Sequence, residues 1–356
     1  MMNWLLIFIP LAIGLEFLAP QLHLFIFLAS ALAILPLAGW MSRATEHLAE
    51  NAGAGVGGLL NATFGNAAEL IIAIAALRAG LPDVVKASLA GSIVGNILLV
   101  LGASMLAGGL RHNEQTYNAA GARSEATLLT LAAIALILPA TYDNLAGPQS
   151  TQVVWHLSVA ISVALLVVYG LFLVFSLVTH KALFRGPLQV ADEAPEVSWP
   201  VNKALTILAV STAAIAWMSE ILVGAIEPTA HEIGLSRVFV GVFIVAILGN
   251  AAEHATAIVA ATKNRMDLSL SIAIGSSVQV ALFVAPVLVI ISLWIGPAPL
   301  DLLFGTGLVV AILLAVLITS QVAGDGRSDW LKGVQLLAVY LILAITFYFV
   351  PVVPVP

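Results

Sequence analysis

The chain has 356 residues, of which 61% are hydrophobic and 9% are charged. This composition excludes an ordinary soluble domain and predicts a protein that crosses a membrane several times. The 13 Lys and Arg residues are scattered along the sequence, which argues against a nucleic-acid partner, and the absence of cysteine excludes disulfides, thiolate metal sites and a thiol nucleophile.

Apolar windows of about 18 to 27 residues, separated by Pro, Gly and charged residues, predict eleven transmembrane helices in an all-α membrane protein. The predicted spans are 3–19, 21–40, 53–79, 83–108, 120–140, 150–178, 201–224, 236–261, 267–295, 300–321 and 331–350. The first has no basic leader and no small-residue cleavage site, so we expect it to be retained as a helix.

The distribution of basic residues predicts the orientation of these spans. With the N-terminus in the cytoplasm, ten of the 13 Lys and Arg residues fall on cytoplasmic loops. The opposite side keeps Arg78, Lys86 and Arg237. Because cytoplasmic loops collect basic residues, we expect a multi-pass protein of the cell membrane with its C-terminus on the far side.

Two short motifs occur twice at a fixed distance. The sequence Gly-Asn-Ala-Ala-Glu ends at Glu69 and again at Glu253, and 253 − 69 = 184. The segments Gly-Ser-Ile-Val and Gly-Ser-Ser-Val begin at Gly91 and Gly275, and 275 − 91 is also 184. Two matches in the same register indicate a duplicated unit.

The predicted orientation makes the duplication an inverted one. The Glu69 span is the third and runs outward, whereas the Glu253 span is the eighth and runs inward. We therefore predict one extra N-terminal helix and two inverted five-helix repeats, an arrangement typical of secondary transporters with a substrate site at mid-membrane. The predicted units are 1–20 for the extra helix, 21–179 for the first repeat, 180–200 for a cytoplasmic acidic linker and 201–356 for the second repeat.

Two further segments have a distinctive composition. The linker carries Asp192, Glu193 and Glu196, which could attract divalent cations, although a solvated connection is the favoured interpretation. Gly53 and Gly57 are four residues apart, a spacing that predicts close helix packing in a membrane.

The repeated glutamates point to a cation site. A glutamate inside a membrane helix costs about 2.5 to 3.5 kcal/mol, so two of them in equivalent positions indicate a shared function. Asn and Glu are three residues apart in each motif and lie on one helix face. Ca²⁺ prefers hard oxygen ligands, and a helix unwound at Gly65 and Gly249 would add backbone carbonyls. The candidate metal ligands are Glu69 and Glu253, and the other candidate site residues are Asn66, Asn250, Ser92, Ser276 and Gln279.

His254 follows Glu253 and has no counterpart in the first repeat, where residue 70 is Leu70. Adjacent helical residues point about 100° apart, so this histidine need not bind the same ion. A proton-relay role and a packing role both remain open, with the functional interpretation slightly favoured.

The charge of the site suggests how transport is coupled. Two carboxylates neutralise one Ca²⁺, whereas without the ion they repel each other and should take up about two protons. Alternate occupancy by Ca²⁺ and protons would make an antiporter by alternating access.

At these residues the sequence resembles the cation/proton exchanger (CAX) family of the Ca²⁺/cation antiporter superfamily. The resemblance covers nearly the whole chain, and it implies a Ca²⁺/H⁺ antiporter with eleven helices that expels cytoplasmic Ca²⁺. It implies no enzymatic activity and no cofactor beyond the transported ions. The acidic run is shorter than the family pattern, and the sequence leaves the oligomeric state open, a homo-oligomer included. The residues that match the family motif are Glu69, Glu253, Asn66, Asn250, Ser92, Ser276, Gln279 and His254.

Three other functions are alternatives. The nearest is a Na⁺/Ca²⁺ or broader cation antiporter with the same fold, and the counter-ion dependence of transport separates it from a Ca²⁺/H⁺ antiporter. A channel would conduct without proton movement tied to Ca²⁺. An intramembrane enzyme is disfavoured because no Ser-Lys, paired Asp or His-Glu-x-x-His arrangement occurs.

Overall fold

The computed structural model describes residues 3–147, 151–180 and 199–350, and nearly all of this chain is helical. The first half contains η1 (Asn3–Ile7), α1 (Phe8–Leu18), α2 (His23–Phe64), α3 (Ala67–Arg78), α4 (Pro82–Val94), η2 (Gly95–Val100), α5 (Leu101–Gly109), β1 (Gln115–Thr116), α6 (Ala119–Ala146), α7 (Thr151–Val174) and η4 (Phe175–Thr179). The second contains α9 (Val201–Ile233), α10 (Arg237–Phe239), η5 (Val240–Val245), α11 (Ala246–Thr262), α12 (Met266–Gln279), η6 (Val280–Val284), α13 (Ala285–Ile291), α14 (Thr306–Val322), β2 (Arg327–Ser328) and α15 (Trp330–Tyr348). The acidic linker residues Asp192, Glu193 and Glu196 lie outside the described residues.

The helices form a membrane bundle. Within the described ranges, eight helices are long and apolar enough to cross a membrane, and 3–18 and 306–322 are shorter apolar helices. The predicted third span, 53–79, is not among these helices, and it is interrupted at Gly65 and Asn66. The polytopic character is confirmed, whereas the eleven-helix count stays a prediction.

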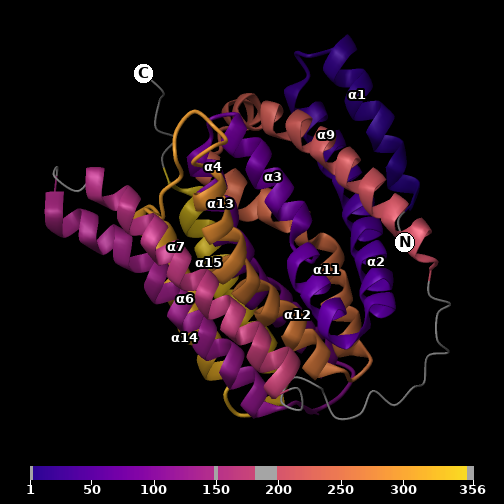
Figure 1. The fold of residues 1–356 in the computed structure, drawn as a ribbon, viewed down its shortest axis with the longest axis vertical. Coiled ribbons are helices and arrows are strands. Elements are labelled where there is room, and N and C mark those ends of the chain that lie inside the picture. Colours follow the sequence, from indigo (N-terminus) through magenta and orange to yellow (C-terminus); the bar gives the residue numbers. More distant parts are fainter. Residues whose placement is uncertain (1–2, 148–150, 181–198, 351–356) are drawn as a thin grey trace.

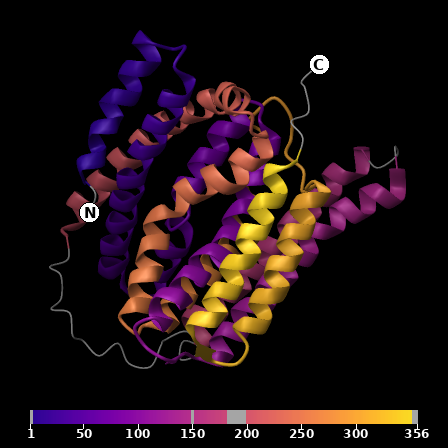
Figure 2. The same cartoon turned by 180° about the vertical axis from the view of Figure 1, so that it is seen from behind.

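The bundle has two outer groups of helices and a central group. Helices α1, α2 and α9 pack together on one side, and α6, α7 and α14 pack on the other (Figure 1). The view from behind shows α15, in yellow, beside α14 (Figure 2). Helices α3, α4, α11 and α12 lie between the two groups. These four central helices carry the repeated motifs.

The long helix α2 corrects a predicted boundary. The sequence predicts a loop at 41–52, but this segment is helical and continues the part of α2 that begins at His23. Polar and charged side chains four residues apart contact each other along this helix, as in the hydrogen bond from Ser42 to Glu46. The charged residues therefore mark the end of the apolar region, whereas the helix continues beyond them. A Cβ on Gly57 would lie 2.2 Å from the carbonyl oxygen of Ala49. In a straight helix these residues are about 12 Å apart. The chain therefore bends back sharply between Ala49 and Gly57.

Equivalent elements recur at the distance of 184 residues. Helices α4 and α12 begin at Pro82 and Met266, and 266 − 82 = 184. Each continues into a π-helical turn, η2 after α4 and η6 after α12. The bounds of η6, 280 and 284, correspond after subtraction of 184 to residues 96 and 100, and both lie inside η2. The two π-helical turns are therefore at equivalent positions.

At one end of the bundle, loops from the two halves are joined. Strands β1 and β2 pair antiparallel, with Gln115 opposite Ser328. Buried Gln115 also donates from Nε2 to the Ala261 carbonyl at 2.9 Å and to Asn264 Oδ1 at 3.0 Å. These bonds connect the α5–α6 loop to the α11–α12 turn and to the α14–α15 loop.

Candidate cation site

The two repeated motifs meet at the centre of the bundle, but with different backbones. In the first copy the helix is interrupted at Gly65 and Asn66, and Glu69 lies in the first turn of α3. The positive end of that helix dipole favours a carboxylate there. In the second copy Gly249 lies inside the continuous helix α11. The predicted unwinding is therefore correct at Gly65 and wrong at Gly249.

Each glutamate lies against the glycine of the other motif. A Cβ on Gly249 would be 3.1 Å from Glu69 Cγ, and a Cβ on Gly65 would be 3.8 Å from Glu253 Oε1. The two carboxyl groups are close enough for their charges to interact. Glu69 and Glu253 therefore both lie at the contact between the two motifs inside the protein.

Four side-chain oxygens of the two motifs are buried and have no hydrogen-bond partner. They are Glu69 Oε1, Glu69 Oε2, Glu253 Oε2 and Asn250 Oδ1. Glu69 is 7% exposed and Asn250 is 1% exposed. Leaving such atoms unpaired costs about 1 to 3 kcal/mol each, more for charged groups, unless a ligand or proton satisfies them. Hard oxygen ligands of this kind suit Ca²⁺.

The orientation of Asn250 follows from its hydrogen bonds. Its Nδ2 donates to Ser92 Oγ and to the Ala246 carbonyl, each at 3.1 Å. These bonds fix the amide nitrogen and leave Oδ1 buried without a hydrogen-bond partner.

The remaining predicted residues form one hydrogen-bonded chain. Asn66 Nδ2 donates to Gln279 Oε1, Ser276 Oγ donates to Asn66 Oδ1 at 3.1 Å, and Asn96 Nδ2 donates to Ser276 Oγ at 3.1 Å. His254 Nε2 lies 2.9 Å from Asn96 Oδ1. The structure thus brings together all eight residues that the sequence nominated.

Asn96 belongs to the site although the sequence did not nominate it. It is 2% exposed and bonds to both Ser276 and His254. The residue 184 positions later is Val280, so a comparison of the two halves gives no match here. Its signal in the sequence was an amide inside the apolar run that follows Gly91.

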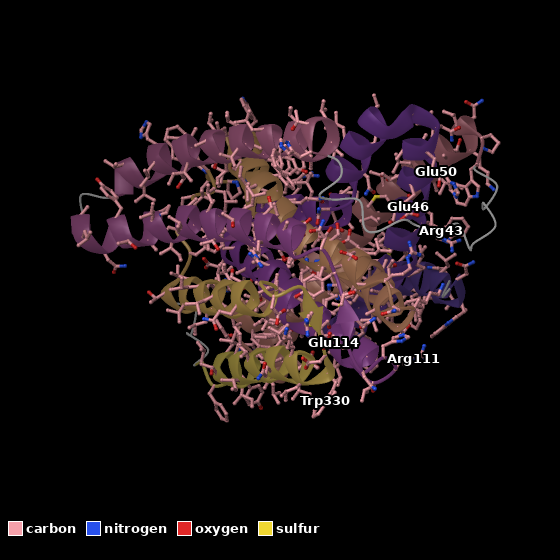
Figure 3. The ribbon with its side chains drawn as sticks, turned by 90° about the horizontal axis from the view of Figure 1, so that it is seen from below. Arg43, Glu46, Glu50, Arg111, Glu114 and Trp330 are labelled. Carbon is pink, nitrogen blue, oxygen red and sulfur yellow. The ribbon has the colours of Figure 1, made fainter. Side chains whose placement is uncertain are left out.

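Two further acids near the site were also missed. Glu125 on α6 is 6% exposed, and its Oε1 lies 3.9 Å from a Cβ built on Gly275. Glu46 on α2 is close enough to Glu253 for their charges to interact. In the view from below, Arg43, Glu46 and Glu50 gather on the α2 side of the bundle (Figure 3).

The donor set of the site is mixed. The described residues contain no group of three or more His, Asp or Glu side chains that could hold a metal ion. A cation here would depend on two carboxylates supplemented by amide and hydroxyl oxygens. Such a set suits a hard ion and offers little to a soft one.

A family model described as sodium/calcium exchanger protein matches the chain twice, at residues 22–178 and 203–349. The chain belongs to this family. The two matched segments flank the linker and together span most of the sequence, and each contains one copy of the repeated motifs.

Within the family, the relatives are antiporters. A Ca(2+)/H(+) antiporter from Aphanothece halophytica is 45% identical, and the match covers 98% of this chain and 96% of the relative. Ca(2+)/H(+) antiporter ChaA from Bacillus subtilis is 44% identical, with 91% and 92% covered. The crystal structure of the selenium-substituted Ca2+/H+ antiporter protein YfkE superposes with a TM-score of 0.81 at 39% identity, covering 98% of this chain and all of that one. The resemblance to the CAX family is confirmed.

Proposed function

We propose that the chain is a secondary active antiporter that exchanges cytoplasmic Ca²⁺ for external H⁺ by alternating access. The observation that carries the proposal is the pair of facing acids, Glu69 and Glu253, with three carboxylate oxygens buried and unpaired. The relatives at 45% and 44% identity are named Ca(2+)/H(+) antiporters, which supports Ca²⁺ and H⁺ as the two exchanged ions.

Electrostatics couples the two ions. Carboxylates that face each other in a poorly hydrated space repel, and either a divalent cation or protons remove the repulsion. The roles we assign are ligation by Glu69 and Glu253, an amide oxygen from Asn250, and support from Ser92 and Ser276. About two protons per Ca²⁺ would leave the site neutral in both of its loaded forms.

The proposed architecture is an extra helix, 1–20, followed by inverted repeats at 21–179 and 201–356. It is supported by the double match of the family model and by the recurrence of α4–η2 as α12–η6 after 184 residues. The excess of basic residues on one set of loops supports a cytoplasmic N-terminus. In this orientation the joined loops around β1 and β2 lie on the cytoplasmic side.

The test is Ca²⁺-driven proton movement in proteoliposomes. We expect Glu69→Gln and Glu253→Gln each to abolish the signal while the proteins elute and unfold like the wild type, because an amide keeps the shape but loses the charge. Glu220→Gln is the matched control, since this exposed glutamate pairs with Arg78 at 3.1 Å, away from the motifs. Full exchange by either site variant would refute the assignment.

A Na⁺-coupled exchange is the second candidate, because the matching family is described by sodium/calcium exchange. The same vesicles distinguish the two when Ca²⁺ uptake is measured with a Na⁺ gradient alone and with a proton gradient alone. We expect uptake with the proton gradient only. Ion current without a counter-ion requirement would instead indicate a channel.

A further inference from the structure

The two halves of the site contain the same Asn and Ser residues but join them in opposite directions. Asn250 donates from Nδ2 to Ser92 Oγ, so the amide is the donor. At the equivalent pair, Ser276 Oγ donates to Asn66 Oδ1, so the amide is the acceptor. Both bonds are 3.1 Å long, and both cross from one half of the chain to the other.

Asn96 accounts for the reversal. Its Nδ2 donates to Ser276 Oγ at 3.1 Å, which occupies a lone pair of that hydroxyl and leaves its single proton to point at Asn66 Oδ1. The counterpart of Asn96 is Val280, which has no donor to offer Ser92. Ser92 therefore accepts a hydrogen bond from Asn250.

His254 holds Asn96 in the orientation that this requires. The Asn96 Oδ1 atom can only accept, so the His254 Nε2 atom 2.9 Å away must be the donor. With the oxygen fixed toward the histidine, the amide nitrogen of Asn96 can only face Ser276. The chain of donors then runs in one direction, His254 to Asn96 to Ser276 to Asn66 to Gln279.

The consequence appears at the amide oxygens. Asn66 and Asn250 are both 1% exposed, but Asn250 Oδ1 has no partner, whereas Asn66 Oδ1 accepts from Ser276. We propose that Asn96 is a positioning residue that makes the halves of the cation site inequivalent, so that Asn250 and not Asn66 presents its amide oxygen to the cation. The inference rests on the proposed function, because it assigns ligands within the same site.

The test compares the loss of Ca²⁺ affinity on removing each amide. The Ca²⁺ dissociation constant is measured by isothermal titration calorimetry on the full-length protein in nanodiscs at one fixed pH. We expect Asn250→Ala to raise this constant by about tenfold, equivalent to about 1.4 kcal/mol, and Asn66→Ala by less than about threefold.

The role of Asn96 is tested by repeating both substitutions in an Asn96→Leu background, which keeps the shape of the side chain and removes its donor. Ser276 can then accept from Asn66 Nδ2, and the Asn66 oxygen loses its donor and takes the place of Nδ2 on the side of Gln279 and Glu253. The effect of Asn66→Ala is therefore expected to grow toward about tenfold. The effect of Asn250→Ala should stay the same. If Asn96 only supported the fold, Asn96→Leu would change the effects of Asn66→Ala and Asn250→Ala on Ca²⁺ affinity equally.

Val280→Asn gives an independent check in case Asn96→Leu does not fold. It supplies the missing donor to Ser92, and the effect of Asn250→Ala on Ca²⁺ affinity should then shrink. If Asn66→Ala and Asn250→Ala, each made in the wild-type background, raise the Ca²⁺ dissociation constant equally, the inference is overturned and the proposed function is not. A wild-type protein that binds no Ca²⁺ would overturn the proposed function as well.

Discussion

The side chain of Glu69 packs directly on Gly249 of the second motif. A Cβ on this glycine would lie 3.1 Å from Glu69 Cγ and 3.6 Å from its Cδ, which is tight for non-bonded carbon atoms. Glycine at this position therefore sets how far the Glu69 carboxylate can reach toward Glu253.

Gly249→Ala is predicted to impair transport more than stability. The added methyl group pushes the Glu69 carboxylate aside by a few tenths of an ångström, so we expect a several-fold higher KM for Ca²⁺ in vesicle uptake. Gly224→Ala is the control, since a Cβ on this α9 glycine meets nothing within 4 Å. An unchanged KM in Gly249→Ala would show that the contact does not position Glu69.

Gly91→Ala is predicted to destabilise the bundle. A Cβ on Gly91 would lie 2.3 Å from the carbonyl oxygen of Val242, which is backbone and cannot rotate away. Separating α4 from η5 should lower the free energy of unfolding by about 1 to 3 kcal/mol. Thermal unfolding in detergent measures the loss. Gly95→Ala, four residues later on the same span, has nothing within 4 Å of its Cβ and should melt like the wild type.

The ion pair between Lys86 and Asp301 is predicted to stabilise the packing of α4 on the segment before α14. Lys86 Nζ is 2.6 Å from Asp301 Oδ1, and the side chains are 12% and 33% exposed. We expect Lys86→Met to cost about 1 to 3 kcal/mol of unfolding free energy, because it removes the cation from a partly buried carboxylate that keeps only the hydrogen bond from the Leu303 backbone N–H.

A double-mutant cycle separates the pairing from the effect of either substitution. Lys86→Met and Asp301→Asn should be strongly non-additive in unfolding. The same cycle on Arg78 and Glu220, whose side chains are 62% and 58% exposed, should give a coupling of less than about 1 kcal/mol. Comparable couplings in both pairs would contradict the prediction.

Gln115→Ala is predicted to loosen the loops that join the halves at one end of the bundle. The substitution removes two hydrogen bonds, to Ala261 and Asn264, from a side chain that is 1% exposed. We expect a loss of about 1 to 3 kcal/mol and faster hydrogen exchange in the α11–α12 turn. Gln321→Ala, at an exposed glutamine, is the control. Unchanged exchange in that turn would show that Gln115 does not secure it.

The sequence was most informative where it repeats itself. The fixed distance of 184 residues predicted that Glu69 and Glu253 belong together, and the structure brings them and their neighbours into one space. Asn96 was missed because its counterpart is Val280 and because, unlike His254 and Gln279, it does not adjoin a repeated motif. Glu125 follows Arg123 by two residues in the sequence, and only the packing of α6 on α12 shows that it is buried.

Backbone conformation was harder to predict than side-chain chemistry. The same five residues interrupt the helix at Gly65 and leave it continuous at Gly249, so packing around the motif decides the outcome. The charged segment 41–52 was predicted as a loop because hydropathy reports where the membrane ends, and helix propensity continues past that point.

The π-helical turns η2 and η6 bear on the origin of the protein. A π-helical turn accommodates one more residue than the α-helical turn it replaces, and such turns are rare and frequently found at functional sites. Here they overlap in register in the two halves, beginning three residues after Ser92 and four residues after Ser276. If the halves arose by gene duplication, the ancestral unit already carried this extra residue, and both descendants have retained it ever since.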